Sequence, residues 1–81
     1  MKYPLYTRVA LTTDLPQFNF MAGDVATVVD MHESARETGY SLEVFNAKGE
    51  TITVLIVDET QIEALQDDEV LHVRHIDNIA A

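Results

Sequence analysis

Apolar and polar residues alternate along several short stretches of this chain, at the two-residue spacing of half-buried β-strands. Residues 25–31, VATVVDM, form such a stretch, and the Gly-Asp pair just before them is typical of a tight turn. Two further stretches, residues 40–45 and 51–57, flank a short connection that contains Gly49, and they predict a hairpin. The pattern thus predicts a sheet of short antiparallel strands.

The chain before and between these stretches supplies the rest of the sheet. Residues 7–11 alternate and predict a first strand, whereas residues 12–22 break the alternation and predict a long loop folded against the core. Residues 32–39 are polar and predict an exposed loop or a strand-end hairpin.

A short helical turn is predicted after the hairpin. Residues 60–63, TQIE, match the capping-box pattern, and Asp58 and Glu59 are acidic residues that suit a helix N-terminus. Together they predict about one turn of α-helix or 3₁₀-helix, followed by a closing strand that begins near Ala64 and Leu65.

These elements describe an all-β fold, a small SH3-like barrel of about five strands with one short helical turn before the last strand. Curling the sheet hides most of its edges and buries one face. Residues 1–81 are expected to form a single domain, with residues 69–81 as an extended C-terminal arm. The alternation places these apolar side chains in the core: Val9, Leu11, Val25, Val28 or Val29, Leu42, Val44, Ile52, Val54, Ile56, Ile62 and Leu65.

The segment from Asp67 to Ala81 is open to two interpretations. Val70, Val73 and Ile76 recur at helical spacing, whereas Leu71 and Val73 fit a short strand followed by a tail. We expect a strand or an extended arm that frays from residue 78 onwards. Because apolar residues of the arm would be costly to leave in water, the arm should pack on its own barrel or pair with a second copy, as in a homodimer.

Composition excludes several classes of protein. The hydrophobic content of 47% is typical of a folded chain, yet no stretch reaches the roughly 20 apolar residues of a membrane helix. The N-terminus lacks the continuous apolar region of a secretion signal, so we expect a cytoplasmic protein. The chain has no cysteine, which excludes a disulfide, a thiolate zinc site and a cysteine nucleophile.

The charge is strongly negative and unevenly distributed. Fourteen acidic residues stand against five basic ones, for a formal net charge of -9, and no lysine or arginine lies between Gly49 and Val73. Such a field repels nucleic acid and anionic membrane surfaces, so neither is expected as a partner. The charge either keeps a small protein soluble or provides a docking face for a basic protein.

Four segments in combination resemble an uncharacterised bacterial family, frequent in cyanobacteria and catalogued as a domain of unknown function of about this length. They are VALTTDLP (9–16), MAGDVATVVD (21–30), YSLEVFNAKGETITVLIV (40–57) and DEVLHVR (68–74). The resemblance covers nearly the whole chain. It implies an SH3-like fold without an established activity. Some family members are encoded beside another small protein, which implies a co-encoded partner of the toxin and antitoxin kind.

The sequence contains one cluster with metal-ligand character, Glu69, His72 and His75, which would share one face of a helix. On a strand, the spacing of three residues sends the two histidines to opposite faces, and the site dissolves. The chain has no nucleophile-elbow serine and no glycine-rich phosphate loop. We therefore expect no enzyme and no cofactor, with a metal-binding protein or metal-dependent enzyme built on this cluster as the alternative.

The leading hypothesis is a non-enzymatic protein-interaction module. Aromatic residues in the long loop are a feature that SH3-like domains use to hold peptides, although the two rings could instead plug the open end of the barrel. The acidic flank would attract a basic partner, for which a co-encoded protein is a candidate. The predicted partner-binding residues are Phe18, Phe20, Asp58, Glu59, Asp67, Asp68 and Glu69.

Overall fold

The structure is a computed structural model that describes residues 2–76. The described chain contains five strands and two short 3₁₀-helices, so the all-β expectation is confirmed. In chain order these elements are β1 (Arg8–Leu11), η1 (Pro16–Phe18), β2 (Val25–Glu33), β3 (Thr38–Phe45), β4 (Thr51–Asp58), η2 (Glu59–Gln61) and β5 (Ile62–Ala64). The predicted fraying from residue 78 onwards lies outside the described residues.

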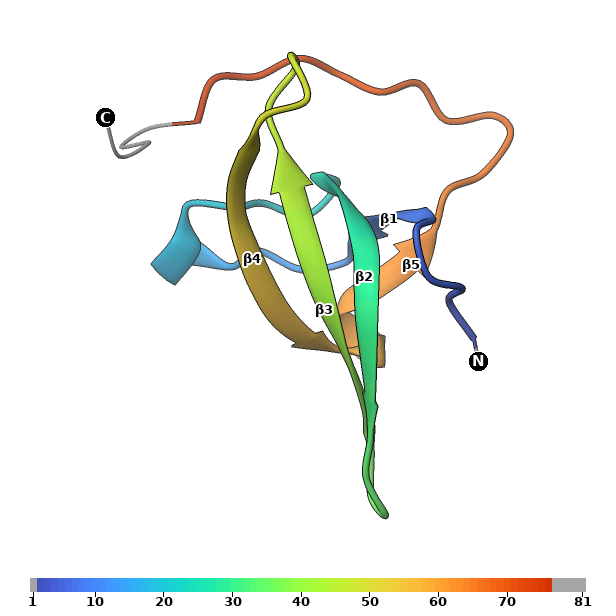
Figure 1. The fold of residues 1–81 in the computed structure, drawn as a ribbon. Coiled ribbons are helices and arrows are strands. Elements are labelled where there is room, and N and C mark those ends of the chain that lie inside the picture. The colour runs from blue at the N-terminus through green and yellow to red at the C-terminus, as the bar shows by residue number, and fades with distance from the viewer. Residues whose placement is uncertain (1, 77–81) are drawn as a thin grey trace.

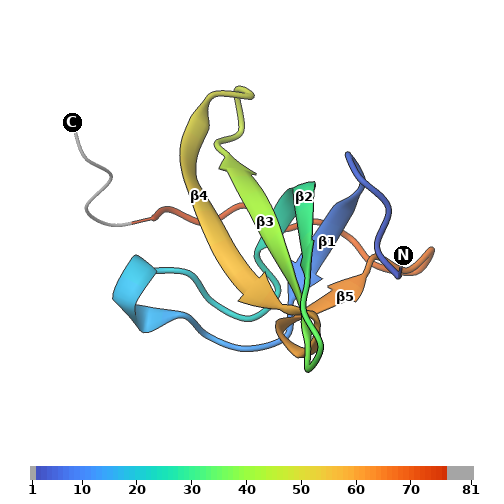
Figure 2. The same cartoon turned by 60° about the horizontal axis from the view of Figure 1, so that its bottom comes forward.

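The five strands form one antiparallel sheet with the order β4-β3-β2-β1-β5. Strands β2, β3 and β4 follow one another as hairpins, and the chain then returns through η2 so that β5 pairs with β1 on the far side. Figures 1 and 2 show that the sheet is strongly twisted and curled. The predicted loop at residues 32–39 is shorter than expected, because both strands of that hairpin continue into it and leave residues 34–37 as the turn.

The core lies on the concave face of this sheet. Tyr40, Leu42, Val9 and Val28 are its largest fully buried side chains. Tyr3, which the sequence pattern did not single out, packs edge-on against Tyr40 with ring centroids 5.4 Å apart and donates a hydrogen bond from its hydroxyl to the Ile62 carbonyl, 3.2 Å away. The N-terminal segment therefore belongs to the folded core.

A register shift in β2 decides which of its valines are buried. Pairing with β3 passes from Val28 to Asp30, which leaves Val29 as the extra residue of a β-bulge. Ala26 and Val28 point into the core before the bulge, and Met31 packs against the core after it. Val25 is half-buried and lies outside the core cluster, so its predicted core position was wrong.

A second register shift reverses the predicted faces of β4. Val44 pairs with Thr53 and Phe45 pairs with Thr51, so Ile52 is the extra residue, and it packs against the core. Beyond this bulge Leu55 and Val57 are buried, whereas Val54 and Ile56 are 56% and 74% exposed. The prediction that Val54 and Ile56 belong to the core was therefore wrong, because strict alternation was counted from Ile52.

The glycines of two turns have the conformation that the sequence predicts, whereas the capping box of η2 is displaced from its predicted position. Gly23 and Gly49 have φ angles of 92° and 83°, in the left-handed region that favours glycine, and each lies in a predicted turn. The turn η2 confirms the predicted helical turn, but its capping box spans Asp58 to Gln61 instead of residues 60–63. Strand β5 therefore begins at Ile62, earlier than predicted, and Leu65 is half-buried outside the core cluster, so its predicted core position was wrong. Asp58 Oδ1 accepts a hydrogen bond from the Thr60 amide at 2.8 Å, because Asp58 is both the end of β4 and the N-cap of η2.

Candidate functional site

Two surface features outside the core have properties typical of binding sites. The first is the free edge of β4. Strand β4 is the last strand in the sheet order, so its second edge pairs with no strand among residues 2–76. Val54 and Ile56 stand exposed on its convex face. Unpaired backbone groups beside exposed aliphatic side chains are a template for the addition of another strand.

Acidic side chains border this edge on the same face. Glu43 of β3 pairs with Val54, and Ser41 pairs with both Ile56 of β4 and Asp30 of β2. Because paired residues in a sheet share a face, Val54 lies beside the carboxylate of Glu43, and Asp30 lies on the same face two strands from Ile56, with Ser41 between them. The free edge thus combines an apolar ridge with a negative flank.

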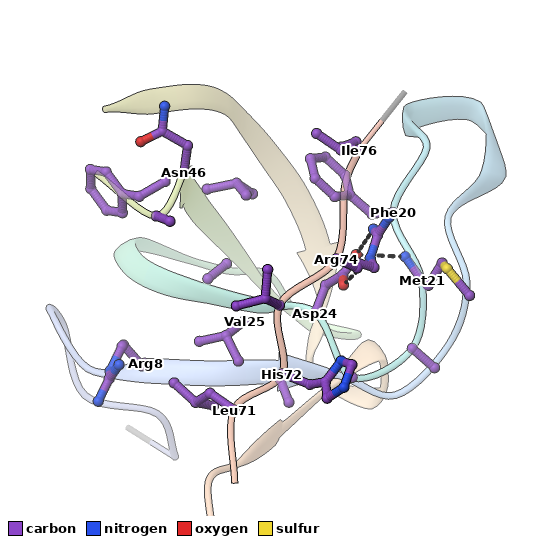
Figure 3. Close-up of a pocket in the computed structure, with 18 of the residues that line it drawn as sticks. Arg8, Phe20, Met21, Asp24, Val25, Asn46, Leu71, His72, Arg74 and Ile76 are labelled. Atoms are coloured by element: carbon purple, nitrogen blue, oxygen red, sulfur yellow. Dashed lines mark hydrogen bonds and ion pairs between the residues drawn. The ribbon is translucent and has the colours of Figure 1, made fainter. Parts of the chain in front are cut away.

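The second feature is a cleft of about 970 Å³ between the sheet and the C-terminal arm, defined here as residues 66–76. One part of the lining of the cleft includes Phe20, Val44 and Ile52, which belong to the core or pack against it. The other part comes from the convex side of β1 and the start of β2, where Arg8, Ala10, Val25 and Thr27 lie. The arm crosses this face as an extended chain without strand pairing (Figures 1 and 3). Ala10 is 4% exposed although it lies outside the core cluster, so the convex face here is covered as well.

An ion pair holds the arm to the edge of this cleft. Arg74 Nε donates a hydrogen bond to Asp24 Oδ1 at 2.8 Å, and its Nη2 contacts Asp24 Oδ2 and donates to the Asn19 carbonyl at 3.2 Å (Figure 3). Two nitrogens of Arg74 therefore contact the two oxygens of the Asp24 carboxylate, and this bidentate geometry is the strongest one for such a pair.

Hydrogen bonds from outside the arm also hold Asp24 in position. The Leu11 amide donates to the Asp24 carbonyl at 2.9 Å, and the Met21 amide donates to Asp24 Oδ2 at 2.8 Å. Partial burial alone would raise the pKa of Asp24, but the hydrogen bonds from Arg74 and Met21 and the charge of Arg74 outweigh it and lower that pKa below its ordinary value of 3.8. Asp24 is thus an ionised acceptor held in position.

The predicted partner-binding residues fall in separate places. Phe18 in η1 is exposed, whereas Phe20 is buried in the core, where it closes the sheet under the long loop. Asp58 and Glu59 are half-buried at η2, and residues 67–69 are exposed at the start of the arm. Figures 1 and 2 place η1 and residues 67–69 on opposite sides of the molecule, so the aromatic loop and the acidic arm do not form one surface.

The alternative metal cluster does not assemble in the described part of the chain. Glu69, His72 and His75 lie along an extended arm, and residues 2–76 contain no group of three histidine or acidic side chains placed to hold an ion. Glu69 instead accepts a hydrogen bond from the Gln66 amide within its own turn.

Sequence reasoning missed the residues that define both features. Asp24 was interpreted as a turn residue, Arg74 was not singled out, and Val54 and Ile56 were placed in the core. A weak signal for Arg74 did exist, because it is the first lysine or arginine after a long acidic stretch, and a lone cation in such a stretch is attracted to carboxylates.

Comparison with known proteins assigns a family without an activity. A family model described as a domain of unknown function, DUF4926, matches residues 5–64, and the chain belongs to this family. No curated protein and no solved structure matches the chain. The matched residues include all five strands and Asp24, whereas the arm lies beyond them. In the described residues no helix is long and apolar enough to cross a membrane.

Proposed function

We propose that this protein is a non-enzymatic interaction module that binds a basic protein partner along the free edge of β4. The observation that supports the proposal is the exposure of Val54 and Ile56 on an edge strand, where two aliphatic side chains meet water beside unpaired backbone groups. A monomer gains nothing from this arrangement, whereas an added strand would cover both.

The binding mode is strand addition. Backbone hydrogen bonds from an extended partner segment would satisfy the outer edge of β4, and alternate side chains of the segment would contact Val54 and Ile56. Lysine or arginine at flanking positions on that same face of the segment would extend across β4 towards Glu43. The proposal thus specifies a partner segment that is extended, partly aliphatic and basic.

The charge of the chain supports the same class of partner. A net charge of -9 attracts basic proteins and speeds their association, whereas it repels the phosphates of nucleic acid. A co-encoded basic protein is the first candidate, and an antitoxin-like role would follow if that protein were toxic when alone.

The test is affinity purification of the tagged full chain from its native cells, compared with two variants. Ile56→Lys places a charge on the edge strand and should reduce recovery of the partner at least tenfold, because an edge lysine blocks strand addition. Val73→Lys makes a similar change on the arm, at a residue that is also largely exposed, and should leave recovery unchanged.

The identity and behaviour of the recovered protein complete the test. We expect a basic protein whose complex weakens as salt is raised. Recovery of no specific protein, or of one that Ile56→Lys retains as well as the wild type does, would contradict the proposal.

A further inference from the structure

We infer that the cleft beneath the arm is a second docking site, which accepts an extended partner segment carrying an arginine and, two residues later, an aliphatic side chain. In the structure, the protein's own arm occupies this site in place of a partner segment. The inference goes beyond the proposed function, because it concerns a cleft that extends from the convex face of β1 and the start of β2 to the core residues that Ile76 contacts, and it uses neither Val54 nor Ile56.

The arm is attached by few side chains and not by its backbone. Among the described residues, the amides of Val70, Leu71 and Val73 have no backbone hydrogen-bond partner. Val70 and Val73 are 90% and 81% exposed. Its contacts with the body include those of Arg74, which reaches Asp24 and the Asn19 carbonyl, and those of Ile76, which packs against the core; Leu71 lines the cleft and is 52% exposed. Such a segment can leave without disturbing the sheet.

The two anchors define what the site recognises. Arg74 and Ile76 are two residues apart, so in an extended chain they point to the same side. Asp24 together with the Asn19 carbonyl offers three acceptor oxygens to a guanidinium, which a lysine could not satisfy in the same way. The motif of a ligand is therefore Arg-x-aliphatic in extended conformation.

The arm itself is a poor match for the rest of the cleft. A volume of about 970 Å³ remains between arm and sheet, and apolar residues of the arm stay in water. The arm also begins with three acidic residues, Asp67, Asp68 and Glu69, in a protein that is already strongly negative. A basic partner segment with the same two anchors would gain from that field, whereas the arm of a second copy would add a further charge of -9.

The test uses a labelled peptide and the full chain in four forms. The peptide has the sequence of residues 66–76 with Asp67→Lys, Asp68→Lys and Glu69→Lys, so that it keeps both anchors and carries a basic flank. Fluorescence anisotropy measures its binding to the wild type, to Arg74→Gln, to Arg74→Gln with Asp24→Asn, and to Arg74→Gln with Ile56→Lys. Asparagine at position 24 keeps an acceptor oxygen for the Met21 amide, and circular dichroism verifies the fold of each variant.

Arg74→Gln releases the internal arm, so it should bind the peptide at least tenfold more tightly than the wild type does. Adding Asp24→Asn should reduce that affinity at least tenfold, and adding Ile56→Lys should leave it unchanged, which separates this site from the proposed site on β4. A peptide of the same composition in scrambled order should bind at least tenfold more weakly.

Three results would overturn the inference. The first is equal affinity of the peptide for the wild type and for Arg74→Gln. The second is an affinity for Arg74→Gln that does not change when Asp24→Asn is added. The third is equal affinity of the original and the scrambled peptide, which would indicate attraction by charge alone. Light scattering of the wild type adds one further outcome. A concentration-dependent dimer that Arg74→Gln dissociates would assign the cleft to the arm of a second copy, whereas a monomer at all concentrations supports a foreign segment.

Discussion

Leu42 in β3 and Leu71 in the arm are the same residue in two regions of one small protein, and they are 0% and 52% exposed. The difference follows from how each region is held. Leu42 lies on a strand whose backbone is paired on both sides, whereas Leu71 lies on a segment attached through Arg74 and Ile76. Residue type alone therefore does not determine burial, and the sheet and the arm should respond differently to the same change.

The largest contrast is expected from truncating an apolar side chain in each region. Leu42→Ala should lower the free energy of unfolding by about 3 kcal/mol, because it removes buried contacts and leaves a cavity. Val73→Ala should change it by less than about 0.5 kcal/mol, because that side chain is already in water. Urea denaturation measures both, and similar values for the two variants would remove the distinction between sheet and arm.

A smaller loss is expected at the junction between β4 and β5. Asp58→Ala removes the side chain that caps η2, and it should cost about 1 kcal/mol in thermal or urea unfolding. Asp67→Ala removes a similar carboxylate from the exposed start of the arm and should have no measurable effect. A loss at Asp67 equal to that at Asp58 would mean that the arm contributes to stability as the sheet does.

The two core tyrosines sharpen the comparison within the sheet. Tyr3→Phe removes the hydrogen bond to the Ile62 carbonyl and should cost about 1 kcal/mol. The Tyr40 hydroxyl is buried and has no hydrogen-bond partner among the described residues, so Tyr40→Phe should be neutral or stabilising by up to about 1 kcal/mol. Unfolding curves of the two variants should shift in different directions or by clearly different amounts.

The smallest effect is expected from acid. Because the pKa of Asp24 is lower in the folded protein than its ordinary value of 3.8, the ion pair with Arg74 contributes fully above that value and is lost as pH falls through the folded pKa. Acidification below pH 3.8 should therefore detach the arm, and NMR shifts of the Arg74 side chain and the Ile76 methyl groups should report it.

Asp24→Asn provides the control for this titration, because it removes the group that titrates. Its arm signals should already resemble the detached state at neutral pH and should change little on acidification. Arm signals that follow pH in the variant as they do in the wild type would show that another group controls the arm.

The sequence predicted the fold better than the binding surfaces, for identifiable reasons. Strand positions, the turns at Gly23 and Gly49 and the short helical turn follow from local chemistry, which a sequence displays directly. The bulges at Val29 and Ile52 are set by pairing with β3, and one extra residue exchanges the faces of every later position in the strand. This is why Val54 and Ile56 were expected inside.

The second surface could not be predicted because it joins distant residues. Asp24 and Arg74 are separated by 50 positions and meet only when β5 directs the arm back over β1 and β2. No local pattern encodes that return. The predicted partner residues, in contrast, were chosen as two local groups, the aromatic residues of the long loop and acidic residues between Asp58 and Glu69. The fold places residues 67–69 on the opposite side of the molecule from the loop that contains η1 (Figure 2).

Amide hydrogen exchange at residue resolution tests most directly whether a stable sheet carries a detachable arm. The account predicts that the amides of Val28 and Leu42 exchange only through global unfolding, while those of Val70, Leu71 and Val73 exchange at nearly the rate of an unfolded chain. Arm amides protected to the same degree as those of the strands would contradict it, since such an arm could not vacate the cleft for a partner.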